Sequence, residues 1–454
     1  MTTTWTDSHL DRMREKMDPF ADEAAAGLIA VRDLRQAMQL LHFLARNDAA
    51  VDVSVNGVSL PPVLQNYFED LSHFQFTKEE KGILDRASEI FAKYGPVITG
   101  VLGVRSLLKQ YAHTKATNVL RMTTLLTEHV DRRITETFQF VLDVMQKGWY
   151  RPNMRGIRSI QKLRLIHALI RHRILNGMTP ESQGSWDPAW GQPINQEDMI
   201  FANQTFSVEV VDGMAQGGFP LSEQDREIFI QAWVLIGKAL GVDASLEPGS
   251  YSEAAALQQK IYERQFTMPN SNGPPLARAL VKFLRDVMPF EADEKSIMTI
   301  IKYFDGVENY KILEDNLQLP LGESHPKLIS HLHQKVGILE TGDHVEGLNK
   351  MTKKELQDGT YPDPVRSKIM EIFMTKVLRT VFRHKRGSKS TSFQIDDALA
   401  DRWGLPGNEG IPAPKEPPID GEKKKHPIME FFYKIGTWLM GLVVKFRELF
   451  AGKA

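Results

Sequence analysis

A single histidine lies on the apolar stripe of a segment with strong helical periodicity. His167 falls within Ile157–Ile174. Its face also carries Leu163, Ile170 and Ile174, which lie four residues before it and three and seven residues after it. An imidazole held in such an apolar wall can be an axial ligand of a haem iron. It can also be an ordinary packed histidine, and the spacing alone favours this second interpretation.

Two further pairs of residues have side chains that can bind a carboxylate or shape a pocket. Arg164 and Arg171 lie one turn before it and one turn after it. On an earlier helical run, Arg133 and Thr137 are four residues apart and therefore share a face. Arginine binds carboxylates, including a haem propionate, through parallel hydrogen bonds. The alternative is a surface arginine paired with a neighbouring acid such as Asp131, and spacing alone favours it.

The elements that would position these residues are helices almost everywhere. Apolar residues recur at intervals of three and four, and the short stretch Val51–Val55 is the only one that alternates, so the sequence predicts an all-α fold. The predicted helices are Ala25–Arg46, Lys78–Tyr94, Ile98–His113, Ala116–Lys147, Ile157–Asn176, Gln196–Gln216, Glu223–Gly241, Tyr251–Phe266, Pro275–Val287, Asp293–Phe304, Lys327–Val336, Lys353–Asp358 and Pro364–His384.

Composition excludes several classes of function. The 454 residues are 42% hydrophobic and carry a net charge of −1, so a sizeable core is expected and a basic footprint for nucleic acid is missing. Because there are no cysteines, thiolate nucleophiles, disulfides, iron–sulfur clusters and thiolate-ligated haem are excluded. The charged N-terminus has no signal-peptide core, and no apolar run reaches the roughly 18 residues of a membrane span, so we expect a cytoplasmic protein.

The C-terminal part of the chain differs in composition from the rest. Residues 385–427 are rich in Lys, Gly, Ser, Pro and Glu and are typical of a flexible linker. Ile428–Phe450 predicts a strongly amphipathic helix, preceded by the cluster Lys423–Lys425. Such a helix can lie in a membrane interface, giving a peripheral location, or it can dock on protein. The pattern leaves both interpretations open.

Four stretches together resemble a known family. They are RRITETF (132–138), QKLRLIHALIRHRI (161–174), WGQPINQEDMIFANQTFS (190–207) and IIKYFDGVENYKILEDNLQLP (300–320). The chain resembles the haem-dependent oxygenase family of latex clearing protein (rubber oxygenase) and the membrane-bound oxygenase of mycophenolic acid biosynthesis. The resemblance covers roughly Phe91 to Pro320, about half of the chain.

The resemblance implies a globin-like helical core that binds one b-type haem non-covalently. His167 would then be the proximal ligand of the iron, and Arg133 and Thr137 would be catalytic residues that line the haem pocket. Arg164 and Arg171 would bind the cofactor by neutralising propionates. The implied chemistry is oxidation or cleavage of carbon–carbon double bonds by O2. The expected organisation is an N-terminal helical extension (1–90), the haem-binding oxygenase-like domain (91–384), the linker (385–427) and the C-terminal helix (428–454).

Two departures from the family pattern bear on the substrate. Rubber-cleaving members have a glutamate upstream of the Arg–Thr pair, whereas Tyr111–Arg121 contains no carboxylate. They also have a lysine just before the threonine, where this chain has Glu136. We therefore expect a smaller apolar or isoprenoid lipid in place of polymeric rubber.

The sequence is also compatible with two functions other than that of a haem oxygenase. The first is a helical lipid-binding or scaffold protein on a membrane surface, in which His167 is merely packed in the core. The second is a haem protein with another activity, such as a peroxidase or an oxygen sensor. The favoured hypothesis is an enzyme, a b-type haem oxygenase that acts on an apolar lipid with O2 and binds no nucleic acid.

Overall fold

The all-α prediction is confirmed. The computed structural model describes residues 5–30, 61–320 and 363–386, apart from positions 73, 123–129, 153, 178, 180–183 and 268, together with 54–55, 58–59, 332, 399 and 402–403. These residues form helices and one minimal hairpin, in which β1 (Ser54–Val55) pairs antiparallel with β2 (Val58–Ser59).

The helices and helical turns of the described residues follow one another along the chain. They are α1 (Asp7–Arg14), α2 (Pro19–Ile29), α4 (Pro62–Ser72), α5 (Lys78–Val101), η1 (Leu102–Ser106), α6 (Leu107–Ala112), α7 (Ala116–Met122), α9 (Val130–Met145), α10 (Arg155–Leu175), η3 (Pro188–Trp190), α11 (Gln196–Gln216), α12 (Glu223–Ala239), η4 (Ala244–Leu246), α13 (Tyr251–Gln265), α14 (Gly273–Asp286), α15 (Glu294–Asp305), α16 (Val307–Leu317) and α19 (Asp363–Arg386).

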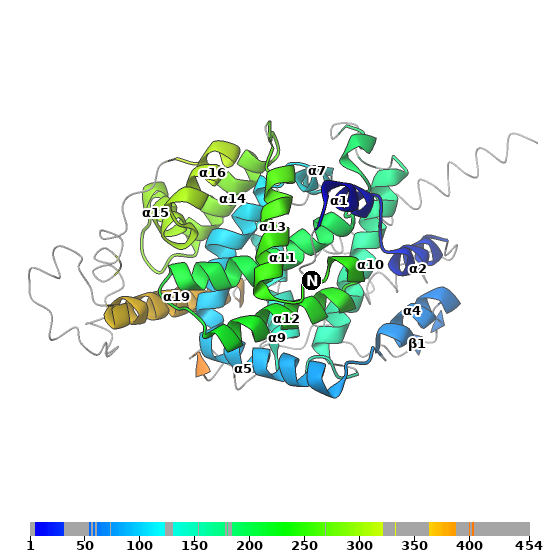
Figure 1. Cartoon of the computed structure of the whole chain (residues 1–454), viewed down its shortest axis with the longest axis horizontal. Helices are drawn as coiled ribbons and strands as arrows, with labels where there is room; N and C mark the ends of the chain where they lie inside the picture. The colour runs from blue at the N-terminus through cyan, green and yellow to red at the C-terminus, as the bar shows by residue number, and fades with distance from the viewer. Residues whose placement is uncertain are drawn as a thin grey trace, which may run out of the picture.

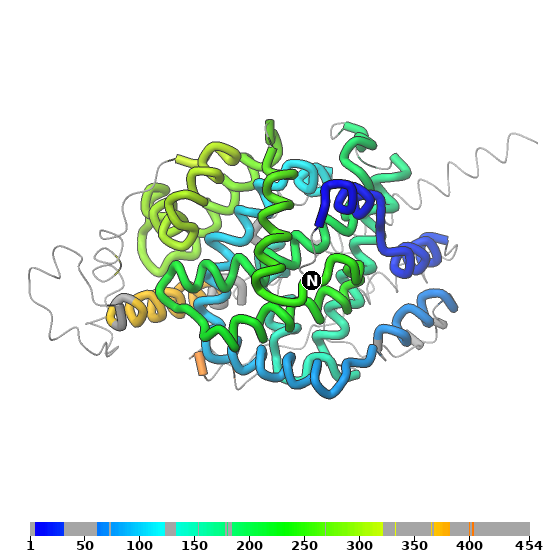
Figure 2. The backbone as a smooth tube through the Cα atoms, viewed as in Figure 1, coloured from blue at the N-terminus to red at the C-terminus, as the bar shows by residue number. Residues whose placement is uncertain are grey.

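Helix α11 lies in the middle of the assembly (Figure 1). It contacts α1, α5, α12, α13 and α15, and it is buried around most of its circumference. Along one side of the molecule α2 packs on α10 and α4, while α14, α15 and α16 gather toward the opposite side. The tube view in Figure 2 shows the N-terminal segment beside α10, far from its place in the sequence. This packing sets the surroundings of His167.

The helix that begins at Lys78 corrects one prediction. The sequence predicts separate helices that end at Tyr94 and begin again at Ile98, but α5 continues through Pro96 to Val101. Pro96 has no N–H to donate to the carbonyl of Ala92, and the indole Nε1 of Trp403 donates to that oxygen instead, at 3.1 Å. Gly95 leaves room for the indole, since a Cβ there would lie 2.0 Å from Trp403. A distant side chain therefore replaces the missing helical hydrogen bond.

The N-terminal part of the chain also differs from its prediction. Helix α2 begins at Pro19, six residues before the predicted start, because Asp18 caps it by accepting a hydrogen bond from the N–H of Ala21 and proline suits the first helical position. Helices α1, α4 and α16 were not predicted.

Several predictions concern residues beyond the described part of the chain. The linker 385–427 lies outside it, apart from positions 385–386, 399 and 402–403. The predicted helices Lys327–Val336, apart from position 332, and Lys353–Asp358 also lie outside it, as does the amphipathic helix Ile428–Phe450. Among the helices that the structure does describe, none is both long enough and apolar enough to cross a bilayer.

Candidate functional site

The imidazole of His167 presents its two nitrogens to different surroundings. The side chain is half-buried near the middle of α10. Among the described residues neither nitrogen has a hydrogen-bond partner; Nδ1 is buried, whereas Nε2 is reached by solvent. Burial lowers the pKa of His167 to about 3, and the charges of Arg171 and Arg133 act in the same direction. The ring is therefore neutral at physiological pH, with an open nitrogen that can ligate a metal.

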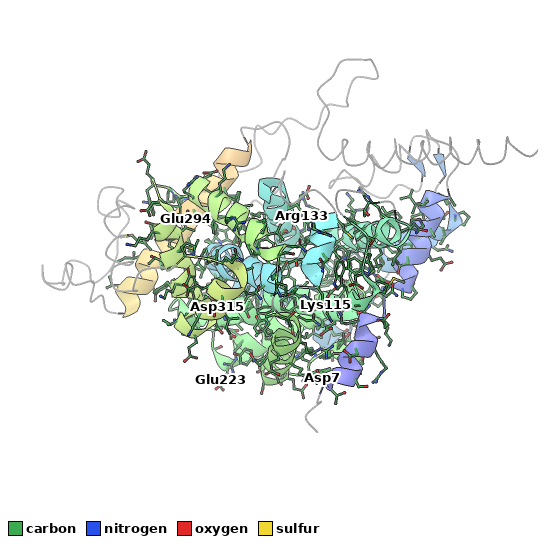
Figure 3. All side chains as sticks on the ribbon, turned by 90° about the horizontal axis from the view of Figure 1, so that it is seen from above. Asp7, Lys115, Arg133, Glu223, Glu294 and Asp315 are labelled. Carbon is green, nitrogen blue, oxygen red and sulfur yellow. The ribbon has the colours of Figure 1, made fainter. Side chains whose placement is uncertain are left out.

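Arg133 on α9 is brought near this imidazole. The two side chains are within electrostatic reach of each other, and α9 packs directly on α10. Arg133 is half-buried, and no residue that the structure describes accepts a hydrogen bond from it or forms an ion pair with it. Burial lowers the pKa of Arg133. Figure 3 shows Arg133 between the end of the molecule that carries Glu294 and the N-terminal helices. An incompletely solvated cation thus lies beside an open imidazole.

Thr137 lies one turn after Arg133 on the same helix. Its hydroxyl Oγ1 donates to the carbonyl oxygen of Arg133 at 2.8 Å. Because this bond uses the only hydroxyl proton, Thr137 can accept a hydrogen bond from a ligand but cannot donate one. Of the roles that a threonine beside Arg133 could have, two remain: its oxygen can accept a hydrogen bond, and its methyl group can contact an apolar ligand.

Tyr111 is a polar residue at this site that sequence reasoning missed. It lies near the end of α6 with 4% of its surface exposed, and no described residue hydrogen-bonds its hydroxyl. Burial raises the pKa of Tyr111 to about 12, and the positive charge of Arg133 opposes that rise. The phenol is therefore a protonated donor within electrostatic reach of Arg133. The only hint in the sequence was that the segment after Tyr111 lacks the carboxylate of rubber-cleaving relatives.

The two arginines that flank His167 have other partners. Arg164 donates from Nε and Nη2 to the two carboxylate oxygens of Asp18, each at 2.8 Å, and from Nη1 to the carbonyl of Ala239 at 3.1 Å. Each nitrogen of this guanidinium donates to a protein oxygen, and a role for Arg164 toward the cofactor stays a prediction. Arg171 binds Asp22 through Nε at 2.7 Å but retains a buried Nη2 with no partner. A role for Arg171 toward a propionate stays a prediction.

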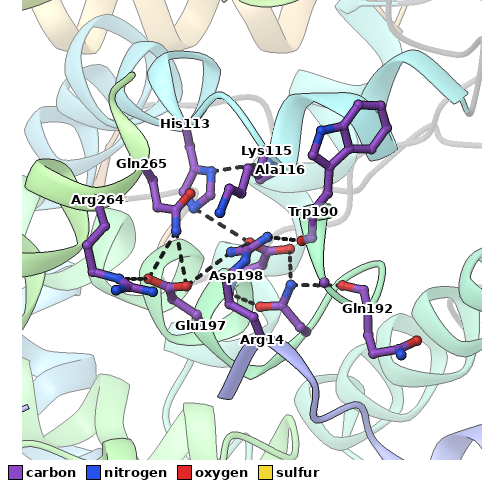
Figure 4. Close-up of polar contacts among 12 residues, drawn as sticks. Arg14, His113, Lys115, Ala116, Trp190, Gln192, Glu197, Asp198, Arg264 and Gln265 are labelled. Atoms are coloured by element: carbon purple, nitrogen blue, oxygen red, sulfur yellow. Dashed lines mark hydrogen bonds and ion pairs between the residues drawn. The ribbon is translucent and has the colours of Figure 1, made fainter. Parts of the chain in front are cut away.

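The third stretch of the family resemblance forms a separate buried network (Figure 4). Arg14 of α1 binds Glu197 and Asp198 at the start of α11, at 3.1 and 3.0 Å. Arg264 of α13 binds the other oxygen of Glu197 at 2.9 Å, and Nε2 of His113 lies 3.5 Å from Asp198. Burial lowers the pKa of His113 to about 3. These buried contacts join α1, α11 and α13, and they belong to the scaffold of the site.

The described residues thus place a neutral imidazole with an open nitrogen beside an arginine that forms no ion pair with any of them. Residues 93–297 match the family model described as "ER-bound oxygenase mpaB/B'/Rubber oxygenase, catalytic domain". This region of the chain, which contains His167 and Arg133, is similar to that family of oxygenase catalytic domains. The family resemblance predicted from the sequence is confirmed.

Two known proteins extend this comparison. A rubber oxygenase of Streptomyces sp. (strain K30) is 24% identical over 253 residues, which cover 54% of this chain and 58% of that protein. The match thus spans less than two thirds of the relative's length. The structure of a latex clearing protein in the closed state superposes with a TM-score of 0.57 at 20% identity, covering 79% of this chain and 91% of that one. The structural likeness shows a shared helical fold.

Proposed function

We propose that this protein is a b-type haem-dependent oxygenase that uses O2 to oxidise or cleave an apolar lipid or isoprenoid substrate. The observation that carries the proposal is the open Nε2 of His167, held by a neutral imidazole inside the region that matches the oxygenase catalytic domain. A packed structural histidine would be expected to satisfy both nitrogens within the protein. Within the part of the chain that the structure describes, neither nitrogen of His167 has a hydrogen-bond partner.

The residues present fit a haem. Iron is bound by the neutral form of imidazole, and burial keeps His167 in that form. Haem also brings carboxylates, which suit a cation that forms no ion pair within the described part of the chain. Arg133, which feels the charge of Glu136 without a direct ion pair to it, is such a cation, and the buried Nη2 of Arg171 is a further unused donor. His167 would hold the iron, and bound haem would supply the centre at which dioxygen is activated.

The polar side chains around His167 can orient the reactants. The guanidinium of Arg133 can donate to a propionate or to an oxygen atom that gains negative charge, and its incomplete solvation strengthens such a bond. The hydroxyl of Tyr111 can donate a second hydrogen bond, because its pKa of about 12 keeps it protonated at physiological pH. Thr137 can accept one. These three residues would position oxygen and substrate, and buried apolar neighbours would exclude water.

The proposed reaction balances without an external reductant. Cleavage of an alkene by one O2 breaks the carbon–carbon double bond and the O–O bond and forms two carbonyl groups. Both oxygen atoms enter the products, and no net electrons are needed. The similarity to a rubber oxygenase supports an isoprenoid substrate. Glu136, exposed on α9, and the lack of a carboxylate in the segment after Tyr111 favour a smaller lipid.

The test is incubation of the full-length haem-loaded protein with an isoprenoid lipid, such as squalene, under 18O2. The proposal predicts carbonyl products that each carry one labelled oxygen, identified by mass spectrometry. Oxygen derived only from water, or peroxide-dependent oxidation in place of O2 consumption, would assign a peroxidase instead. A protein that binds lipid vesicles but takes up no haemin would assign the lipid-binding scaffold.

A further inference from the structure

Two ion pairs from a distant part of the chain flank His167. Arg164 lies three residues before it and binds Asp18, and Arg171 lies four residues after it and binds Asp22. We call these the α2 ion pairs, since Asp18 caps α2 and Asp22 lies in its first turn. The acids precede their partners by 146 and 149 residues.

The first of the α2 ion pairs is fully satisfied. The guanidinium of Arg164 and the carboxylate of Asp18 meet through two hydrogen bonds of 2.8 Å, and both side chains are more than nine-tenths buried. The same guanidinium lies over the ring of Phe20, 5.7 Å from its centroid. Burial alone would lower the pKa of Arg164, but the ion pair raises it. A fork-to-fork contact of this kind fixes direction as well as distance.

The second pair is less complete. Arg171 is 2% exposed and donates from Nε to Asp22 at 2.7 Å and from Nη1 to the carbonyl of Ile194 at 3.3 Å. Its Nη2 and the second oxygen of Asp22 are buried without partners. Burial accordingly raises the pKa of Asp22. The pair still ties the following turn of α10 to α2, so the helix is held on both sides of His167.

The α2 ion pairs can fix the orientation of α10 more specifically than apolar packing alone. Burying charged pairs gives little net stability compared with well-packed apolar residues, but it specifies one register and one orientation. A helix held at two points one turn before and one turn after a residue cannot rotate about its axis without breaking one of them. The direction of the His167 imidazole depends on that rotation, because its Nε2 is open and its Nδ1 is buried.

We propose that Asp18 and Asp22 are positioning residues for His167, so that the N-terminal helix α2 sets the orientation of the cofactor ligand. The inference rests on the proposed haem function of His167. It also places part of the proposed oxygenase site's support outside the region 93–297 that matches the family model. Neither acid touches the cofactor; both act through α10.

The experiment compares D18N and D22N in the full-length protein. Asparagine is as good an N-cap as aspartate, so D18N can keep the cap of α2 while it removes the charge and one of the two oxygens that accept from Arg164. The matched control is E23Q, which removes the same charge from an exposed position of α2. A second control is E209Q, which disrupts the buried pair of Glu209 with Arg105, away from α10. Haemin dissociation, the absorption spectrum and amide hydrogen exchange of apo α10 are measured for each.

The proposal predicts haemin dissociation about tenfold faster or more in D18N and D22N, with a shifted Soret band, and faster exchange of the amides around residues 164–171. E23Q should match the wild type. E209Q should melt at a lower temperature without changing the exchange of α10. If D18N does not fold, D22N provides the comparison, because Asp22 is more exposed at 23%.

The inference is overturned if D18N and D22N lower the melting temperature but leave α10 exchange and haemin dissociation as in the wild type. Wild-type protein that takes up no haemin overturns the proposed function instead. In that event the hydrogen exchange of the apo variants still decides whether α2 holds α10, so the two failures are distinguishable.

Discussion

Two arginines near His167 differ in how completely their guanidinium groups are bonded. Arg164 of α10, on the side that faces α2, has an acceptor for each of its nitrogens. Arg133 of the neighbouring helix α9 has no acceptor among the described residues, and burial lowers its pKa. A buried cation with a full set of partners belongs to the scaffold, whereas a cation left without one is suited to a ligand that brings negative charge.

The largest effect that would sharpen this comparison is expected from R164M. The substitution leaves the carboxylate of Asp18 buried without its partner, so the free energy of unfolding of the apo protein should fall by about 3–5 kcal/mol, measured in urea. The double variant D18N/R164M removes both charges and should recover much of that loss. If the free energy of unfolding of R164M lay within about 1 kcal/mol of the wild-type value, the proposed difference between Arg164 and Arg133 would be contradicted.

R133M is expected to affect turnover more than stability. Removing a half-buried charge that forms no ion pair with a described residue should leave the stability of the apo protein unchanged or raise it. Turnover of the lipid substrate should fall about hundredfold, since a donor to developing negative charge is lost. Exposed Arg278 on α14 provides the control R278M, for which neither quantity should change. Loss of stability in R133M with normal turnover would contradict the assignment.

The buried histidines predict how stability depends on pH. The native pKa values of His167 and His113 are about 3, below the ordinary value of 6.5. Below pH 6.5 the unfolded chain therefore binds protons that the native protein excludes, and stability falls as the pH falls. The slope for each group approaches about 1.4 kcal/mol per pH unit only well below pH 6.5. Between pH 7 and 5.5, each histidine should therefore lower the free energy of unfolding of the apo protein by about 1.2 kcal/mol in total, measured in urea, and H167N should lose one of these two contributions. An unchanged slope in H167N would contradict the burial of His167.

The smallest effect is expected from Y111F. Because the hydroxyl of Tyr111 has no described protein partner, the stability of the apo protein should change by less than about 0.5 kcal/mol. Turnover should fall severalfold, because one donor near Arg133 is lost. Y303F is the control: the hydroxyl of Tyr303 donates to the carbonyl of Gly217, so that variant should lose stability and keep turnover. Normal turnover in Y111F would remove Tyr111 from the site.

Local patterns predicted the fold class but not every element boundary. Helical periodicity is a property of neighbouring residues, so the helices from α9 to α15 follow closely from the sequence. The continuation of α5 through Pro96 does not, because the hydrogen bond that makes it possible comes from Trp403, 311 residues away from Ala92. A proline predicts a helix break only when nothing else satisfies the freed carbonyl.

The candidate site could be predicted only in part for the same reason. The family resemblance identified His167, Arg133 and Thr137 from motifs, and α9 and α10 are consecutive helices that pack together. The partners of Arg164 and Arg171 lie at the other end of the chain, and spacing along α10 carries no information about them. Spacing therefore identified the two flanking arginines but not the acids Asp18 and Asp22 that bind them.

The most direct test of the central claim is a haemin titration followed by absorption spectroscopy in the oxidised and reduced states. Wild-type protein and H172A, which alters a half-buried histidine of the same helix, should each bind about one haem per chain with a Soret band, whereas H167A should lose most of the binding. Equal haem binding by H167A and the wild type, or no binding by the wild type, would contradict the account.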